Sequence, residues 1–239
     1  GIILNAPNQW EAFTYYYRGD ASVYPLPRGR ADEAILEPEL EAIAAAHDRL
    51  YVLYWGDGQR DPEQIIEHWL DGHTYKASEE WVGDVRFAIY SVPDAERSIP
   101  MTMAGAEFAG LDGETITLRE FGYWPRDALS GEIVQVRLLW SADERPSRPY
   151  KVFLHLLDNS GQPVAQRDSE PVGGFRPTVT WQPGEVIEDN YGLALPADLT
   201  AGTYELRLGL YDAFDPARRL AVGDQDGLTL GSVIVALPE

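Results

Sequence analysis

The spacing of apolar residues along the chain changes near residue 95. Before that point, short apolar runs alternate with segments whose apolar residues recur at helical spacing. These patterns predict strands over residues 2–5, 22–27, 50–55 and 85–92, and helices over residues 6–19, 37–50 and 62–70. In the first helix, Trp10, Phe13, Tyr16 and Tyr17 fall on one face. Strands that alternate with helices predict a small layered α/β domain.

Beyond residue 107, polar and apolar residues alternate with a period of two. The runs that follow this pattern are residues 115–124, 133–140, 150–158, 186–195, 203–212 and 228–237. Short strands separated by turns, without helical patterns between them, predict an antiparallel β-sandwich of Greek-key, immunoglobulin-like or carbohydrate-binding-module-like type. The step Gly202-Thr203-Tyr204 resembles the tyrosine corner of such sandwiches. We therefore predict an α/β domain over residues 1–95, a linker over 96–106 and a sandwich over 107–239.

Composition narrows the possible partners and chemistries. The chain has 39 acidic and 19 basic residues and a net charge of −20, which disfavours nucleic acid as a partner because its phosphates require basic groups. The absence of cysteine excludes disulfides and thiolate catalysis. No apolar run reaches the length of a membrane span. The chain begins with Gly1 and no initiator methionine, so we expect a fragment whose targeting or anchoring segment would lie upstream.

A glycine-rich turn, WGDGQRDP, follows the third predicted strand. Glycines let backbone N–H groups approach a phosphate, but Asp57 and Asp61 would repel one. The simpler interpretation is structural: Gly56 and Gly58 form the turn, and Asp61 caps the next helix. A metal or sugar-hydroxyl site remains an alternative, because open α/β sheets bind ligands at the carboxyl ends of their strands.

Two further groups of residues are candidate metal ligands. His68 and His73 lie five residues apart near Glu67 and Asp71, a spacing that does not place both imidazoles on one helical face. The segment GDQDG resembles part of a calcium loop through Asp224 and Asp226, but it lacks the distal glutamate of an EF-hand and also suits an acidic hairpin turn. We predict no cofactor, with calcium at these two aspartates as the only candidate.

Aromatic residues on or beside the sandwich strands are candidates for glycan binding. Trp124, Trp181 and Tyr191 could present flat faces to pyranose rings, although a two-sheet core also requires large aromatic side chains. Because turn-forming residues surround Trp181, we expect it to be the most exposed of the three. Substitution of Trp181 by alanine would then weaken glycan binding and leave folding nearly intact, whereas unfolding would place this side chain in the core.

Two stretches resemble a known family. The segments ILNAPNQWEAFTYYYRGDASVYPLPRG and DRLYVLYWGDGQRDPEQIIEHWLDGHTYKASEEWVGDVRFAIYSV resemble the soluble region that follows the membrane spans in bacterial polytopic glycosyltransferases of family 39, the protein O-mannosyltransferase and aminoarabinose transferase group. The later segment YKVFLHLLDNSGQPVAQRDSEPVGGFRPTVTWQPGEVIEDNYGLALPADLTAGTYELRLGLYD is similar to a sandwich appended to such proteins. The resemblance implies that the catalytic acids lie in an early loop between membrane helices, and that the donor is a polyprenyl-phosphate sugar. That loop is absent here, so no catalytic residue is carried over.

These observations predict a non-catalytic extracytoplasmic segment of a membrane glycosyltransferase-like protein, located at the extracytoplasmic face of a bacterial membrane. Its expected partners are a glycan or glycosylation acceptor and the membrane-spanning part of the same chain, and the sandwich could instead be a spacer. One alternative is a self-contained hydrolase or transferase with a carboxylate site near Asp57 and Asp61. The other is a purely structural interaction module.

Overall fold

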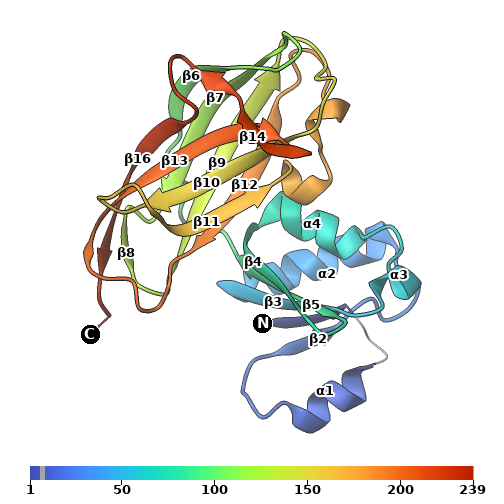
Figure 1. Cartoon of the computed structure of the whole chain (residues 1–239). Helices are drawn as coiled ribbons and strands as arrows, with labels where there is room; N and C mark the ends of the chain where they lie inside the picture. The colour runs from blue at the N-terminus through green and yellow to red at the C-terminus, as the bar shows by residue number, and fades with distance from the viewer. Residues whose placement is uncertain (6–8, 239) are drawn as a thin grey trace. The chain divides into compact units, whose positions relative to one another are not determined.

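The chain folds into two units, Gly1–Ser98 and Ile99–Glu239, in a computed structural model that describes residues 1–5 and 9–238 (Figure 1). The first unit is a layered α/β domain and the second is an antiparallel β-sandwich, so the predicted fold class is confirmed. Strand β6 (Thr102–Ala109) begins within the range predicted as a linker. Within the described residues, none of the helices has the length and apolar character needed to cross a membrane.

The sheet of the first unit has the strand order β4-β5-β3-β1-β2. The strands are β1 (Ile2–Asn5), β2 (Val23–Pro25), β3 (Arg49–Tyr54), β4 (Tyr75–Val82) and β5 (Val85–Ser91). β1 pairs in parallel with β2 and β3, whereas β5 pairs antiparallel with β3 and β4. The hydrophobic pattern missed β4, because the second half of this strand is exposed and rich in polar residues.

The helices of this unit are α1 (Trp10–Tyr16), α2 (Glu33–Ala45), α3 (Asp57–Arg60) and α4 (Ile65–His73). α2 begins earlier than predicted because the Asp32 carboxylate caps it, accepting a hydrogen bond from the Ala34 N–H at 3.0 Å. Pro38 therefore lies inside the helix and not in its first turn.

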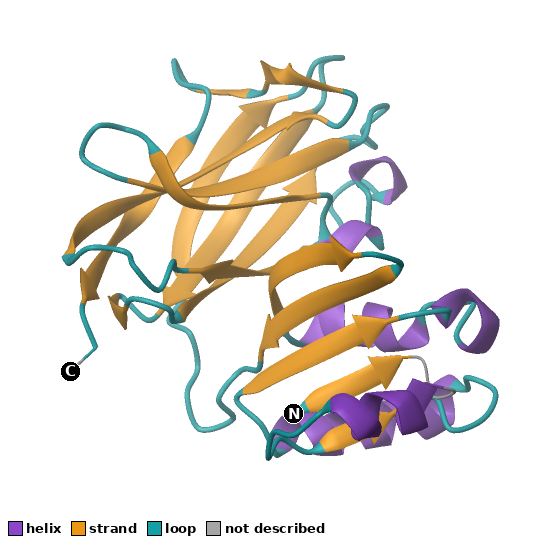
Figure 2. Cartoon of the chain, turned by 60° about the horizontal axis from the view of Figure 1, so that its bottom comes forward, coloured by secondary structure: helices purple, strands orange, loops and turns teal. Residues whose placement is uncertain are grey.

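One face of the sheet carries the core of the first unit. The core side chains come from the sheet, α2, α4 and the segment around Leu26, and are Ile3, Leu26, Leu36, Leu40, Ile43, Leu50, Val52, Tyr54, Ile66, Leu70, Ala88 and Tyr90. Figure 2 shows α1 on the near side of the sheet and α2 and α4 behind it. None of the residues of α1 is buried. The two faces of this sheet are therefore covered very differently.

The second unit contains two layers of strands. Within the unit, one layer has the order β15-β6-β7-β9-β12, and the other has the order β11-β10-β13-β16-β8 with β14 beside β13. The remaining strands are β7 (Thr115–Trp124), β8 (Asp127–Leu129), β9 (Ile133–Ala142), β10 (Tyr150–Leu157), β11 (Pro163–Ser169), β12 (Ile187–Ala194), β13 (Gly202–Asp212), β14 (Asp215–Arg219), β15 (Ala221–Val222) and β16 (Leu228–Ala236). Two short 3₁₀ turns, Val172–Gly174 and Thr178–Thr180, lie between β11 and β12.

The inward-facing side chains of both layers form one core, and a tyrosine corner stabilises its edge. The Tyr204 hydroxyl donates a hydrogen bond to the Thr200 carbonyl oxygen at 2.8 Å, which confirms the feature predicted from Gly202-Thr203-Tyr204. All six predicted sandwich strands are present as β7, β9, β10, β12, β13 and β16. The pattern missed the short strands β8, β14 and β15. It also missed β6, which is mostly exposed, and β11, whose side chains are only partly buried or exposed.

Candidate functional site

An apolar pocket of about 530 Å³ lies between α1 and the face of the sheet opposite α2 and α4. The sheet contributes Leu4, Leu53 and Val85 to its wall. The helix side contributes Ala12, Phe13, Tyr16 and Tyr17, and the remaining lining residues are Gln9 and Trp55. Its size is typical of small-molecule sites, which are concave and mostly apolar. We regard this pocket as the main candidate site.

The pocket follows from the alternation of side chains along β1, β3 and β5. Side chains in a strand point alternately to opposite faces, so the residues between the core positions share the other face. These residues form two rows, Ile2-Tyr51-Ile89 and Leu4-Leu53-Phe87, which the strand register places side by side. We call these six residues the second face. Of the helices that the structure describes in this unit, only α1 lies over it.

α1 is poorly buried for a helix so rich in aromatic residues. The rings of Phe13 and of Tyr17, the residue that follows the helix, stack with their centroids 5.2 Å apart, and both side chains are only partly buried. Trp10, Tyr15 and Tyr16 are exposed. The sequence signal for this site was the helical spacing of four aromatic residues, Trp10, Phe13, Tyr16 and Tyr17. An aromatic face of this kind indicates that the helix is buried, but the spacing does not show that the burial is incomplete.

The glycine-rich turn supplies little to the site. Asp61 is fully buried, and its two carboxylate oxygens accept hydrogen bonds from the N–H groups of Ile65 and Ile66 at 2.9 and 3.0 Å. Asp61 therefore caps α4 as the structural interpretation predicted, although α4 begins at Ile65 and not at residue 62. The prediction that Asp61 binds a ligand was wrong, because both of its carboxylate oxygens already accept hydrogen bonds and the residue is hidden from solvent. The side chain of Asp57 lies outside the described residues.

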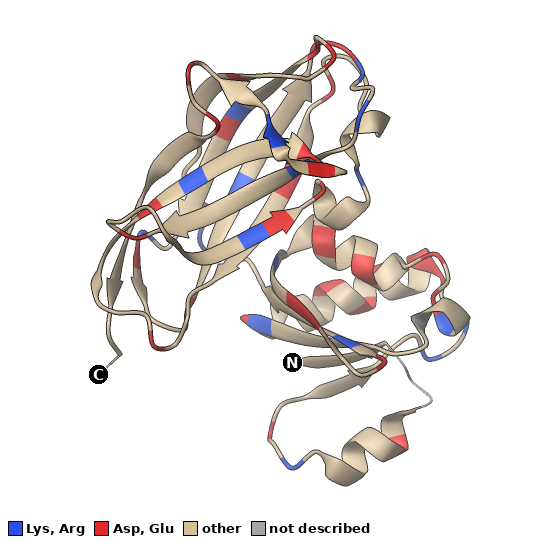
Figure 3. Cartoon of the chain, in the orientation of Figure 1, with Lys and Arg blue, Asp and Glu red and all other residues tan. Residues whose placement is uncertain are grey.

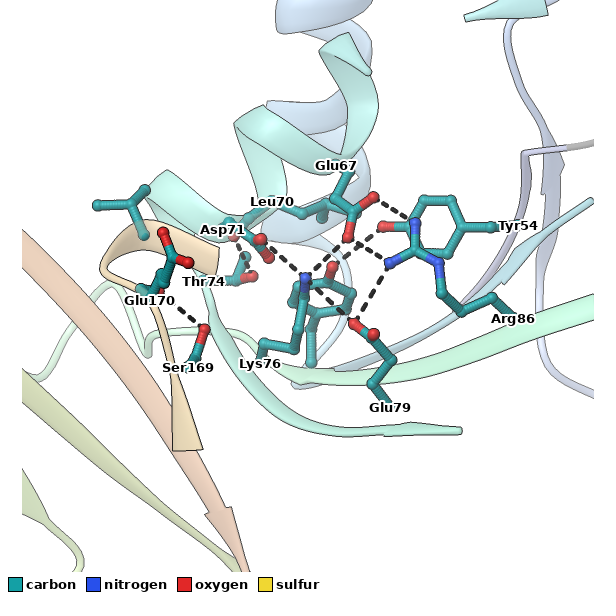
Figure 4. A network of polar contacts seen from close by, with 12 residues as sticks. Tyr54, Glu67, Leu70, Asp71, Thr74, Lys76, Glu79, Arg86, Ser169 and Glu170 are labelled. Carbon is teal, nitrogen blue, oxygen red and sulfur yellow. Dashed lines mark hydrogen bonds and ion pairs between the residues drawn. The ribbon is translucent and has the colours of Figure 1, made fainter. Parts of the chain in front are cut away.

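A buried ion-pair network connects α4 with β4 and β5 (Figure 4). The Lys76 ammonium donates hydrogen bonds to Glu67 Oε1 at 2.9 Å and to Asp71 Oδ2 at 2.7 Å. Arg86 forms a two-pronged contact with Glu67 and a longer one with Glu79 at 3.3 Å. The side chains of Lys76, Glu67 and Asp71 are all nearly inaccessible to solvent.

The surroundings shift the protonation equilibria of this network in opposite directions. Burial alone would raise the pKa of Glu67, but hydrogen bonds and charge from Arg86 and Lys76 outweigh it and hold that pKa below its ordinary value. Burial raises the pKa of Asp71 despite its contact with Lys76. Burial also raises the pKa values of Tyr54 and Tyr90, whose hydroxyls lie 3.0 Å apart.

Shifted pKa values often mark functional sites, but here they belong to side chains that are almost fully buried: Tyr54, Glu67, Asp71 and Tyr90. Its acids are paired with Lys76 and Arg86, and the guanidinium of Arg86 lies 4.2 Å from the centre of the Tyr54 ring. The arrangement attaches α4 to the sheet. Glu67 and Asp71 face these cations, while His73 stacks on Trp69 at 4.5 Å between ring centroids. The hydrophobic pattern could not reveal this network, because it depends on Lys76 and Arg86 from separate strands.

The calcium candidate has a different role in the structure. Asp226 forms ion pairs with Arg207 and Arg219, each at 2.8 Å. Partial burial alone would raise the pKa of Asp226, but the hydrogen bonds and charges of these two arginines lower it. Two guanidinium groups therefore occupy the oxygens that a cation would need. Across residues 1–5 and 9–238, no group of three or more His, Cys, Asp or Glu side chains is placed to hold a metal ion.

The aromatic candidates of the sandwich are mostly part of its core. Trp181 is fully buried and its Nε1–H donates a hydrogen bond to the Arg176 carbonyl oxygen at 2.9 Å, so the expectation that it is exposed was wrong. The turns around it fold over the end of the core, and the indole fills the space beneath them. Tyr191 is also buried, which prevents a sugar from stacking on it. Trp124 is 37% exposed and is the one of the three that solvent reaches substantially.

Comparisons with known proteins do not assign the chain to a family. No protein-family model and no curated protein matches the sequence. Among solved structures, the C-terminal domain of Wzt is similar over 58% of this chain and 78% of its own, with 13% identity and a TM-score of 0.36. The CARDB domain of a Pyrococcus furiosus protein in complex with di-metal ions matches 57% of this chain and 100% of its own, with 11% identity and a TM-score of 0.32.

A third structural match is a Niemann-Pick type C2 protein from Japanese carpenter ant. It covers 59% of this chain and 100% of its own, with 8% identity and a TM-score of 0.31. TM-scores this low carry no argument about function. The function has to be argued from the residues of this chain.

Proposed function

We propose that this chain is a non-catalytic extracytoplasmic segment of a bacterial membrane glycosyltransferase-like protein of family 39 type. In this proposal the α/β unit docks on the membrane-spanning part of the same protein through the second face of its sheet. The sandwich assists recognition of a glycan or glycosylation acceptor, or serves as a spacer. The unequal covering of the two sheet faces is the observation that carries the proposal.

The row Ile2-Tyr51-Ile89 supports docking on the second face. It lies beside the row Leu4-Leu53-Phe87. Tyr51 and Phe87 stack with their ring centroids 6.1 Å apart, and both side chains, like Ile89, are partly exposed. β1, β2 and β3 pair in parallel, and parallel sheets are normally covered on both faces. An apolar partner that covered this row would complete the layered arrangement.

The charge distribution agrees with this direction of docking (Figure 3). α2, which covers the other face, carries four glutamates, Glu33, Glu37, Glu39 and Glu41. α1, on the same side as the second face, carries the single acid Glu11. An apolar protein surface can approach the side of α1 at a lower desolvation cost than the acidic side of α2.

The enzymatic alternative at Asp57–Asp61 receives no support from Asp61, which is used as a helix cap. The burial of Trp181 and Tyr191 favours the structural-module alternative for the sandwich.

Glycan recognition by the sandwich now depends on Trp124 alone among the predicted aromatic residues. A glycan-array screen of the wild type and the Trp124→Ala variant tests this part: saturable binding that is lost in the variant supports recognition, and an array without binding favours the spacer.

Photo-crosslinking of the full-length protein in its membrane tests the docking. A benzoylphenylalanine at position 89 should form adducts with a membrane-spanning segment of the same chain. The matched control is position 35 on α2, where the isoleucine is 66% exposed and should give no such adducts. Equal crosslinking from both positions would contradict the proposal, as would a gene that encodes no membrane-spanning segment.

A further inference from the structure

The pocket beneath α1 has the properties of a binding site that the proposed docking does not require. On the sheet it lies over Leu4, Leu53 and Val85, whereas docking was assigned to the row Ile2-Tyr51-Ile89. Its wall combines aliphatic side chains of the sheet with aromatic side chains of the helix. A volume of about 530 Å³ is enough to hold a small molecule.

The chemistry of the wall excludes several classes of ligand. A sugar has hydroxyl groups and a peptide has backbone N–H and C=O groups, and each of these loses free energy when it is buried without a hydrogen-bond partner. The lining offers polar groups only at Gln9, at the phenols of Tyr16 and Tyr17, and at Trp55, whose indole N–H already donates to Asp84 Oδ2 at 3.0 Å. Among the side chains that the structure describes, none of those lining the pocket is charged, so they provide no counter-ion for a buried anion or cation. A hydrocarbon chain needs none of these partners.

α1 itself points to the same class of ligand. The helix has seven residues, which is too short to be stable without packing. None of these residues is buried, and its aromatic residues Phe13 and Tyr16 line the pocket on the side opposite the sheet. An apolar chain that filled the pocket would bury both walls at once and would fix α1 against the sheet.

We propose that the pocket between α1 and the second face binds a hydrocarbon chain, either a linear acyl or alkyl chain or a branched isoprenyl chain. Leu4, Leu53 and Val85 form the floor, and Phe13, Tyr16 and Tyr17 form the roof. The polar end of the ligand lies at the open side of the pocket. Binding stabilises α1 in its helical position.

The test uses the whole 239-residue chain and the neutral fluorophore N-phenyl-1-naphthylamine, whose emission rises in apolar surroundings. We expect saturable binding to one site, with displacement by 1-dodecanol, by farnesol or by both. The two competitors distinguish a linear from a branched chain. Saturable binding that neither alcohol displaces, or an absence of saturable binding, would overturn the proposal.

Neighbouring tyrosines provide a matched pair of variants. Tyr16 lines the pocket and Tyr15 does not, although both belong to α1 and are 79% and 68% exposed. Tyr16→Ser should weaken probe binding roughly fivefold, because part of the apolar roof is lost, whereas Tyr15→Ser should change it by less than about twofold. Equal weakening would place the probe on the outer surface of α1 and contradict the proposal.

A pocket-filling variant makes the test independent of the stability of α1. Ala12→Phe keeps the helix apolar and places a ring in the pocket, so we expect it to abolish displaceable binding while the far-ultraviolet circular dichroism remains unchanged. Undiminished binding by this variant would also overturn the proposal. Since the assay needs no membrane and no glycan, its outcome is separate from that of the crosslinking experiment.

Discussion

The two units differ in how completely they cover their own apolar surface. The sandwich has two layers whose inward side chains meet in one large core, and its tryptophans Trp140 and Trp181 are fully buried in it. The α/β unit has a core on one face of its sheet, while the other face carries partly exposed apolar side chains and a loosely seated helix. This difference shows that many aromatic residues in a segment do not by themselves identify a binding site. What matters is whether those residues already have partners within the fold.

The units also differ in how they use charge. In the α/β unit, the Lys76 and Arg86 network is buried at the junction of a helix and the sheet. In the sandwich, the ion pairs of Asp226 with Arg207 and Arg219 lie at the surface, where solvent weakens them. We therefore expect core substitutions to affect the sandwich most and charge substitutions to affect the α/β unit most.

The largest expected effect is that of Trp181→Ala. Removal of a fully buried indole should lower the free energy of unfolding of the sandwich by about 4 kcal/mol, because a cavity and an unpaired Arg176 carbonyl remain. Denaturant unfolding followed by fluorescence measures this loss. The matched control Trp124→Ala should cost less than about 1 kcal/mol, because this side chain is 37% exposed. Similar losses for both variants would mean that Trp181 is not a core residue.

Lys76→Met should have the next largest effect, and it should be confined to the α/β unit. The substitution leaves Asp71 buried without its cation and removes one of the two cations beside Glu67, which should cost roughly 3 kcal/mol. Hydrogen exchange of the α4 and β4 amides reports the loss. Equal destabilisation of the sandwich strands would contradict the assignment of the network to one unit.

Acidification should reveal the role of Glu67. Its pKa is held below the ordinary value of 4.5, so its ionised form contributes stability above that value, and this contribution is lost as pH falls through the lowered pKa. Asp71 acts in the opposite sense, because its raised pKa makes its ionised form unfavourable in the folded unit. The stability gap between the wild type and Glu67→Gln should therefore be widest at neutral pH and narrow below pH 4.5. A gap independent of pH would exclude the ionised Glu67 as the stabilising group.

The smallest predicted effect concerns the tyrosine corner. Tyr204→Phe removes the hydrogen bond to the Thr200 carbonyl and keeps the ring, so we expect a loss of about 1 kcal/mol in the free energy of unfolding. Thermal unfolding of the sandwich measures it. Thr203→Val, one residue away, is the control for a change in polarity without loss of this bond. A loss for Tyr204→Phe no larger than for this control would show that the hydrogen bond adds nothing to stability.

Much of the fold could be predicted from local patterns. The run over residues 115–124 predicts β7 with its observed ends, although the alternation breaks where the register shifts between Leu118 and Glu120. Gly202-Thr203-Tyr204 predicts a specific hydrogen bond. The helix ends that capping side chains determine were harder to predict from the sequence. Asp32 caps α2 and makes it start earlier than predicted, and Asp61 caps α4 although three residues separate it from the start of that helix.

The site could be predicted only in part. The helical spacing of Phe13 and Tyr16 indicates an apolar face, but how much of it is buried depends on Leu4 and Leu53 from strands distant in sequence. The exposure of Trp181 was predicted wrongly for the same reason, because its neighbours in sequence are turn residues whereas its neighbours in space are core residues. Local composition describes the former and says nothing about the latter.

Hydrogen–deuterium exchange of the whole chain, with and without 1-dodecanol, tests most directly whether the α/β unit is the half with unsatisfied apolar surface. The account predicts slower exchange of the amides of α1, β1 and β3 when the alcohol is present, and unchanged exchange in the sandwich strands. Protection confined to the sandwich, for example around Trp124 in β7, would contradict it. Exchange that stays unchanged throughout the chain with 1-dodecanol, and also with farnesol in its place, would contradict it as well.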